Sequence, residues 1–153
     1  LLLPDHIDKM IKNMKQYPDK RAWNATGNIN SEEELNLHSF VKCAIANDHQ
    51  IIHCFRKTPY FSDIKIQQTF VRKILGIIAY RRDFLLQLNE LPESAIESAE
   101  FIEQMRIVEN NYDIHSVSVE PSLPSVNEPH EVDIILDYIN NNEEQAALLK
   151  KIL

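Results

Sequence analysis

The sequence predicts an α/β fold of three layers, with a mostly parallel sheet, helices on both faces and one antiparallel hairpin. Three observations lead to this fold class. Apolar runs of strand length alternate with helical patterns, two of the runs are separated by only four turn-forming residues, and 153 residues suffice for one hydrophobic core. We therefore expect a single domain over residues 1–153.

Helices are expected where apolar residues recur three and four positions apart, and where acidic or capping residues open the pattern. An acidic residue near the start favours a helix because the N-terminus carries unpaired N–H groups. Helical segments are predicted between Pro4 and Tyr17 and at residues 30–34, 81–88, 101–108, 130–138 and 143–153.

Strands are expected in short apolar runs bounded by turn residues. They are predicted at residues 23–26, 41–46, 51–55, 73–80 and 114–119. Asn-Asp-His-Gln at 47–50 favours a turn, so the second and third strands should form a hairpin. Residues 58–68 contain Pro59 and few apolar cues, and this segment is expected to be irregular.

Charge and composition limit the classes of partner. The chain has 16 Lys and Arg against 23 Asp and Glu, a net charge of -7, and no basic run that could neutralise a series of phosphates, which argues against nucleic acid. Its three opening leucines have no basic flank and predict neither a signal peptide nor a membrane span. Cys43 and Cys54 lack zinc-site spacing and are expected to be buried thiols, which fits a cytoplasmic protein.

The chemistry that the residues indicate by themselves is limited. Gly27 and Gly76 are isolated, so no glycine-rich loop is present to bind a phosphate. Glu97, Glu100 and Glu103 lie three apart, which would align their carboxylates on one helix stripe. Such a stripe could hold a metal or an acid/base pair, or could be an ordinary solvated face. Periodicity does not decide whether Glu103 or the following residue faces a cleft beside the sheet.

Several segments carry a resemblance to a known family. Ser94–Glu97, followed by Phe101–Glu109, is similar to the SPLE…LEQLR segment of the 3-deoxy-manno-octulosonate (Kdo) cytidylyltransferases. Leu75–Leu85 resembles the family's HxGIYxYR strand and the helix after it. Four further segments match in the same order as in the family. Residues 4–8 resemble the helix that follows its QGDEP motif, and residues 36–42 resemble its NPNxVK stretch. Residues 54–59 resemble its FSRxxIP segment, and residues 125–132 resemble its GVDTPEDL segment.

The resemblance implies the C-terminal portion of a nucleotide-diphospho-sugar transferase fold, with the N-terminal nucleotide-binding part outside this chain. It implies transfer of CMP from CTP to Kdo or a related acidic sugar, with Mg²⁺ and release of pyrophosphate, for lipopolysaccharide or capsule assembly. It also implies a homodimer, joined partly through residues 57–70.

Carried over position by position, Glu103 and Gln104 match the family's sugar-contacting Glu-Gln pair, which would read sugar hydroxyls through hydrogen bonds. Arg56 matches an arginine that could form a bidentate pair with the sugar carboxylate. Asn127 stands where the family has its second metal-binding aspartate and is the candidate metal position.

Two departures leave alternatives open. Ile74 and Ile78 occupy the positions of a histidine and a tyrosine that contact the sugar in the family. These changes, together with Asn127, are compatible with a divergent synthetase for another acidic sugar. They are also compatible with a catalytically degenerate paralogue that acts as a binding or assembly module, or with a resemblance of fold alone.

Overall fold

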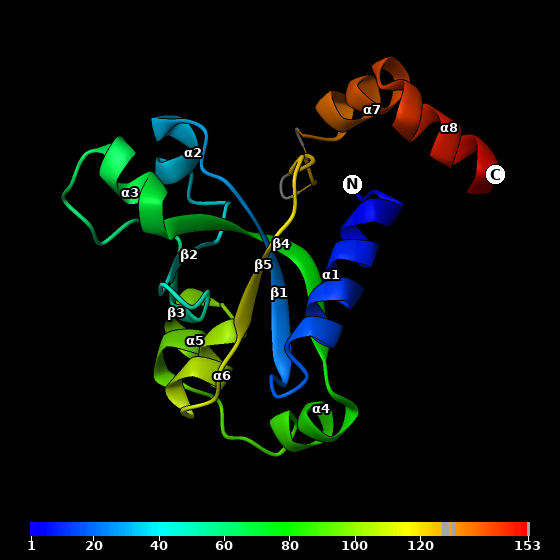
Figure 1. Cartoon of the computed structure of the whole chain (residues 1–153). Helices are drawn as coiled ribbons and strands as arrows, with labels where there is room; N and C mark the ends of the chain where they lie inside the picture. Colours follow the sequence, from blue (N-terminus) through cyan, green and yellow to red (C-terminus); the bar gives the residue numbers. More distant parts are fainter. Residues whose placement is uncertain (127–128, 130, 153) are drawn as a thin grey trace. The chain divides into compact units, whose positions relative to one another are not determined.

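The computed structural model describes residues 1–126, 129 and 131–152. The chain divides into two compact units, one of residues 5–122 and the other of residues 1–4 with 123–153. The larger unit contains the sheet (Figure 1). Whether residues 1–153 act as one domain stays a prediction.

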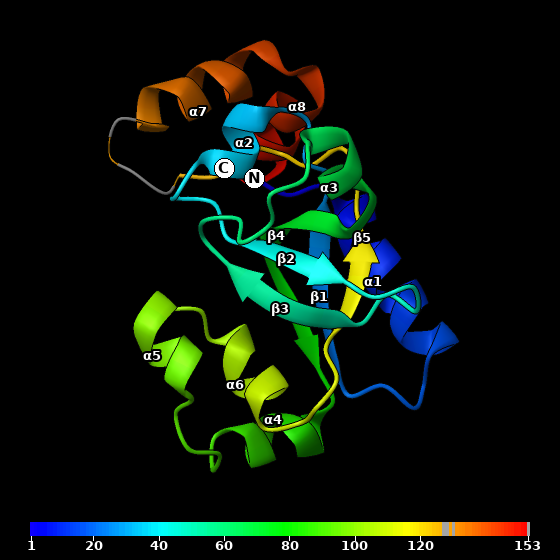
Figure 2. The ribbon, with the colours of Figure 1, turned by 90° about the vertical axis from the view of Figure 1, so that its left-hand side faces the viewer.

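The sheet has five strands in the order β3-β2-β4-β1-β5. Their bounds are Ala22–Gly27 for β1, Lys42–Ile45 for β2, Ile51–Phe55 for β3, Val71–Tyr80 for β4 and His115–Ser118 for β5. Every strand lies where the sequence predicts one, and the β2–β3 hairpin is confirmed. The tip of this hairpin meets the opposite edge strand, since Ile51 N donates to Ile114 O at 2.9 Å and Gln50 bridges to His115 (Figure 2).

The α/β class and the helices on both faces are confirmed, but the prediction of a mostly parallel sheet is wrong. Among the described residues only β1 and β5 pair in parallel, whereas the other three pairings are antiparallel. Alternating strand and helix patterns do not fix direction, because a connecting segment can return the chain to either end of a sheet. Here β4 returns antiparallel to both β1 and β2.

Within residues 5–122, helices cover both faces of the sheet (Figures 1 and 2). The helices of the described residues are, in chain order, α1 Pro4–Gln16, α2 Glu32–Asn36, α3 Ile64–Phe70, α4 Arg82–Leu88, α5 Ala95–Glu100, α6 Gln104–Glu109, α7 Glu131–Asn141 and α8 Glu143–Ile152. The last two belong to the smaller unit. Within the described residues, no helix combines the length and the apolar character that crossing a bilayer requires.

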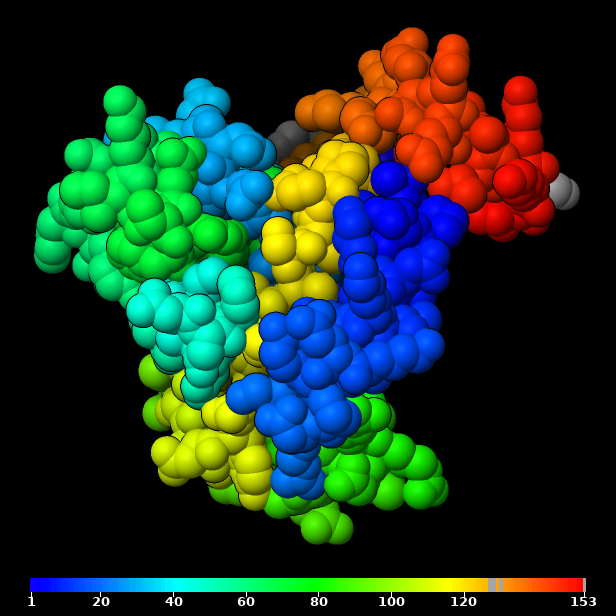
Figure 3. Space-filling model, in the orientation of Figure 1, coloured from blue at the N-terminus to red at the C-terminus, as the bar shows by residue number. Residues whose placement is uncertain are grey.

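The side chains of β1 alternate between two apolar clusters. Trp23 packs with Met10 of α1 on one face, while Ala22 packs with Phe84 of α4 and Met105 of α6 on the other. On the first face, the side chains of α1 lie beside those of the β5 segment (Figure 3). Burial on both faces explains why β1 has no exposed residue.

Two local predictions need correction, and one is confirmed. The segment 58–68 is not irregular throughout, because α3 begins at Ile64, where Asp63 Oδ1 accepts from Ile66 N at 3.1 Å. The predicted helix at 101–108 is shorter at its start, and a separate helix, α5, precedes it. Cys43 and Cys54 are free buried thiols, as predicted, and face each other across the hairpin.

Candidate functional site

Helices α5 and α6 place Gln104 against the sheet and leave Glu103 exposed. Residues 101–103 join the two helices, and Phe101 ends α5 with a left-handed backbone at φ 55° and ψ 50°. This conformation is uncommon for a bulky residue and is held by its surroundings. The next residue, Ile102, is buried in the core, whereas the Phe101 side chain is exposed. The sharp turn therefore starts α6 in a new direction.

A bidentate ion pair fixes the two helices to each other. Arg106 donates from Nε and Nη2 to the two carboxylate oxygens of Glu97, both at 2.7 Å. Glu97 also accepts from Ser94 N at 3.2 Å, so one carboxylate closes the start of α5 and contacts α6. The hydrogen bond from Arg106 is the main reason that the pKa of Glu97 lies below its ordinary value.

The structure corrects the prediction that three carboxylates align along one helix. Glu97, Glu100 and Glu103 do not follow one helix, because the helix ends at Phe101 and a new one begins after Glu103. Glu97 is nearly buried in its pair with Arg106. The three carboxylates are therefore not gathered for metal binding or acid/base chemistry.

Gln104 is buried at the start of α6 and forms a hydrogen bond with the central strand. Its Nε2 donates to Asn24 Oδ1 at 3.0 Å. Asn24 is fully buried in β1 and donates from Nδ2 to Ala25 O at 2.8 Å and to Leu75 O at 2.9 Å. A buried amide pair of this kind is costly unless its groups are paired, and here the pairing holds α6 to the sheet.

Glu103 differs from its neighbour, because its side chain is exposed. The negative charge of Glu103 nevertheless affects two buried groups. The pKa of Tyr80 is raised mainly by burial and secondly by the charge of Glu103. The same two causes raise the pKa of Cys54 to about 12. The pair thus presents an exposed carboxylate beside a buried amide, a combination suited to reading hydroxyl groups.

Arg56 follows β3 and lies at the same turn. Its Nε donates to Glu100 O at 2.9 Å, and Nη1 and Nη2 make longer contacts of 3.4 Å with His38 O and Phe101 O. These carbonyl groups include two at the end of α5, where helix carbonyls lack intrahelical partners. Arg56 therefore supports the turn that positions α6, and its predicted contact with a sugar carboxylate stays a prediction.

The two aliphatic departures lie in β4 opposite β1. Ile78 is the register partner of Asn24, and Ile74 is the partner of Thr26. Thr26 Oγ1 and Ser116 Oγ are 2.7 Å apart in the interior. At these two positions β4 presents aliphatic side chains, whereas Thr26 of β1 and Ser116 of β5 provide polar groups.

Lys42 is a buried cation that the sequence did not single out as functional. It lies in β2, is fully buried and donates from Nζ to Leu37 O at 2.7 Å. Burial, and secondly the positive charge of Arg56, lower the pKa of Lys42 to about 8.

Lys42 should make a contribution to the free energy of unfolding that rises with pH. The lysine pKa is about 8 when folded and 10.5 in the reference state, so between these values the unfolded chain binds more protons and rising pH favours folding. The gain is about 3 kcal/mol at most by the free energy of one pKa unit. Above pH 9 the buried thiols Cys43 and Cys54, whose pKa values are raised, act in the opposite direction in every variant, so the slopes are compared between proteins. In urea unfolding from pH 7.5 to 10.5, the parent and Lys57→Met, whose lysine is exposed, should share one slope, and Lys42→Met should have a less positive one. Equal slopes in all three proteins would contradict this assignment.

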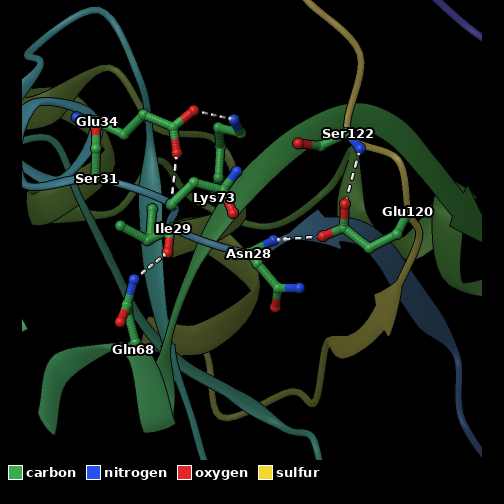
Figure 4. A network of polar contacts seen from close by, with 9 residues as sticks. Asn28, Ile29, Ser31, Glu34, Gln68, Lys73, Glu120 and Ser122 are labelled. Atoms are coloured by element: carbon green, nitrogen blue, oxygen red, sulfur yellow. Dashed lines mark hydrogen bonds and ion pairs between the residues drawn. The ribbon is translucent and has the colours of Figure 1, made fainter. Parts of the chain in front are cut away.

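The loops that follow β1 and β5 are joined by one carboxylate (Figure 4). Glu120 accepts from Asn28 N at 2.8 Å and from Ser122 N at 2.9 Å. These strands are parallel, so the two loops leave the same edge of the sheet. In α/β sheets this carboxyl edge is where ligands commonly bind.

A second carboxylate, that of Glu34, connects the loop after β1 to β4 (Figure 4). Glu34 accepts from Asn30 N at 2.9 Å and forms an ion pair of 2.9 Å with Lys73. Gln68 donates to Ile29 O at 2.7 Å, which anchors the same loop to α3. The loop after β1 is therefore held by three side chains, those of Glu120, Glu34 and Gln68.

The predicted metal position cannot be placed, because Asn127 lies outside the described residues. Among the residues that are described, no group of three His, Cys, Asp or Glu side chains could hold a metal ion. Because Mg²⁺ is commonly held by one or two carboxylates together with substrate phosphates, the Mg²⁺ requirement implied by the resemblance stays a prediction.

The chemistry of the site was only partly visible in the sequence. The resemblance identified Glu103 and Gln104, and the structure brings both to the turn beside Arg56. Asn24 was missed because it lies in a short strand of otherwise apolar and small residues. A lone amide in such a strand is the signal that could have identified it, since a buried amide requires a partner.

Comparison with known proteins tests the family that the sequence resembles. A family model described as Cytidylyltransferase matches residues 1–114. The 3-deoxy-manno-octulosonate cytidylyltransferase of Chlamydia caviae is 24% identical over 133 residues, which is 87% of this chain and 52% of that protein. The enzyme of the same name from Leptospira interrogans is 37% identical over 86 residues, 53% of this chain and 35% of that protein.

A solved structure gives the same result. The CMP:2-keto-3-deoxy-manno-octonic acid synthetase complexed with CTP has a TM-score of 0.79 and 25% identity, covering 91% of this chain and 57% of that one. The chain spans about half the length of the curated relatives it matches. The family predicted from the sequence is confirmed: the chain belongs to the cytidylyltransferase family.

Proposed function

We propose that this chain is the sugar-binding part of a cytidylyltransferase that transfers CMP from CTP to Kdo or a related acidic sugar. The observation that supports it most is the exposed Glu103 beside the buried Gln104–Asn24 pair, at positions matching the family's Glu-Gln motif. The relatives named for octulosonate sugars and the fold shared with a CTP complex support the same substrates.

In the proposed reaction, the anomeric hydroxyl oxygen of the sugar attacks the α-phosphorus of CTP. A new P–O bond forms, the bond to the bridging oxygen breaks, pyrophosphate leaves and the hydroxyl proton is released. The described residues would orient the sugar, because hydrogen bonds that fix its hydroxyls also fix the attacking oxygen. A role in lipopolysaccharide or capsule synthesis, a cytoplasmic location, a homodimer and a Mg²⁺ requirement belong to this proposal.

The test uses the product of the native gene. Pyrophosphate release should require both CTP and an acidic sugar, with Kdo and its 8-amino analogue assayed in parallel. Gln104→Leu should lower kcat/KM for the sugar about 10–100-fold, as the loss of one or two buried hydrogen bonds predicts. Gln16→Leu is the matched control, because Gln16 is exposed on α1, and it should retain parental activity.

A lack of pyrophosphate release with every acidic sugar would overturn the proposal. If the protein still bound CTP or the sugar, the result would favour a catalytically degenerate binding module, for which Ile74 and Ile78 are the relevant departures.

A further inference from the structure

The central pairing of the sheet contains an irregularity that involves Asn24. Along β1 and β4, Asn24 pairs with Ile78 but Thr26 pairs with Ile74, so β4 has extra residues opposite one position of β1. Such a bulge leaves backbone groups without ladder partners. Asn24 Nδ2 is directed toward the carbonyls there, at 2.9 Å from Leu75 O and 3.5 Å from Ile77 O.

These carbonyls determine which way the Asn24 amide faces. A carbonyl oxygen only accepts hydrogen bonds, so the donor Nδ2 must face Leu75 O and Ala25 O. The acceptor Oδ1 is then directed away from the bulge. It meets Gln104, which must in turn place its donor Nε2 toward Asn24 at 3.0 Å.

The orientation of Gln104 leaves its oxygen available. With Nε2 committed to Asn24, Oε1 is the atom that remains, and no described residue donates a hydrogen bond to it. Gln104 retains 5% exposure, and the preceding residue, Glu103, is exposed. The turn before α6 therefore carries an unfilled amide acceptor on one residue and an exposed carboxylate on the next.

We propose that Asn24 is a positioning residue that fixes Gln104 Oε1 as a hydrogen-bond acceptor, so that the site selects sugars presenting a hydroxyl or amino donor at that point. The inference rests on the proposed function and adds a determinant of specificity to it. A site of fixed polarity discriminates strongly, because a bound ligand without the donor would exclude water from this acceptor and leave it unpaired. Without Asn24, the Gln104 amide could rotate and present either atom.

The test compares Asn24→Leu with Thr26→Val in the product of the native gene. Thr26 lies two residues along the same strand, and Thr26→Val removes a buried hydrogen bond with Ser116 while it leaves the Asn24–Gln104 pair in place. We expect Asn24→Leu to raise the KM for the sugar about 10-fold, the value of one hydrogen bond, with KM for CTP unchanged. Thr26→Val should leave the sugar KM at the parental value.

A readout that does not depend on activity separates this inference from the proposed function. In the parent, the Gln104 side-chain NH₂ protons should exchange slowly with solvent, and in Asn24→Leu their exchange should become fast. If the parent shows this protection but releases no pyrophosphate, the proposed function fails while the orientation of Gln104 stands. Fast exchange in the parent, or an equal rise in sugar KM for Thr26→Val, would overturn the inference.

A second variant covers the case in which Asn24→Leu does not fold. In Asn24→Asp, the protonated carboxyl group can donate to Leu75 O and accept from Gln104, as the amide does. An ionised carboxyl group would also accept from Gln104 Nε2, so Gln104 keeps its orientation in either protonation state. The sugar KM of Asn24→Asp should therefore stay near the parental value, and a rise of about 10-fold in this folded variant would contradict the positioning role.

Discussion

Replacing Phe84 with alanine is expected to lower the free energy of unfolding by about 3–5 kcal/mol, the usual cost of removing a fully buried aromatic ring. Phe84 has no exposed surface and belongs to the cluster between the sheet, α4 and α6. The Tyr112 ring lies 5.2 Å from it, and the Arg21 guanidinium carbon lies 4.6 Å from its ring centre. The substitution would therefore leave a cavity and also remove an aromatic and a cation–π contact.

Urea unfolding of the whole chain measures this effect, with Phe61→Ala as the matched control. Phe61 is the same residue type but is fully exposed, so its truncation should change stability by less than about 0.5 kcal/mol. Equal losses in the two variants, or a loss below about 1 kcal/mol for Phe84→Ala, would show that the cluster around α4 is not part of the folded core.

Replacing Gly27 with alanine should destabilise the protein by about 1–3 kcal/mol, as overpacking does. A Cβ atom at this position would lie 2.6 Å from Ser122 Cβ and 3.1 Å from Ser122 Oγ. Gly27 ends β1, and the backbone of Ser122 is held by Glu120, so neither side can move freely. The added methyl group should force apart the two loops that Glu120 joins.

Gly76→Ala is the control for this prediction. A Cβ atom at Gly76 would meet nothing within 4 Å. Replacing glycine by alanine where space is available tends to stabilise by about 0.4–1 kcal/mol, because the unfolded chain loses freedom. Thermal unfolding of the two variants should therefore shift the midpoint in opposite directions. A downward shift of the same size in both would mean that the contact with Ser122 is not the cause.

The positions of the strands could be predicted from the sequence, but their directions could not. Residues 41–55 indicated a hairpin because two apolar runs flank turn-forming residues, and this is what forms. The direction of β4 relative to β1 depends on connections whose path is set by packing rather than by local pattern. Helix α3 was missed because its start rests on one capping residue, Asp63, within a polar stretch.

The sequence indicated which residues form the candidate site, but not which way their side chains face. The resemblance led to Glu103 and Gln104, but periodicity assumed one continuous helix and could not say which of them is buried. The left-handed backbone of Phe101 decides this, and bulky residues give no signal for such a conformation. The partner of Gln104 is 80 positions away in the sequence, so their contact exists only in the folded state.

The connection between α5 and α6 also restricts how this protein can diverge. Only three residues separate the end of α5 from Gln104, and its amide must meet an asparagine held in the central strand. Inserting or deleting one residue here would rotate α6 by about 100° about its axis and direct Gln104 away from Asn24. Length changes that surface loops elsewhere tolerate are therefore excluded at this joint, and homologous chains that bind the same sugar group should keep its length constant while its sequence varies.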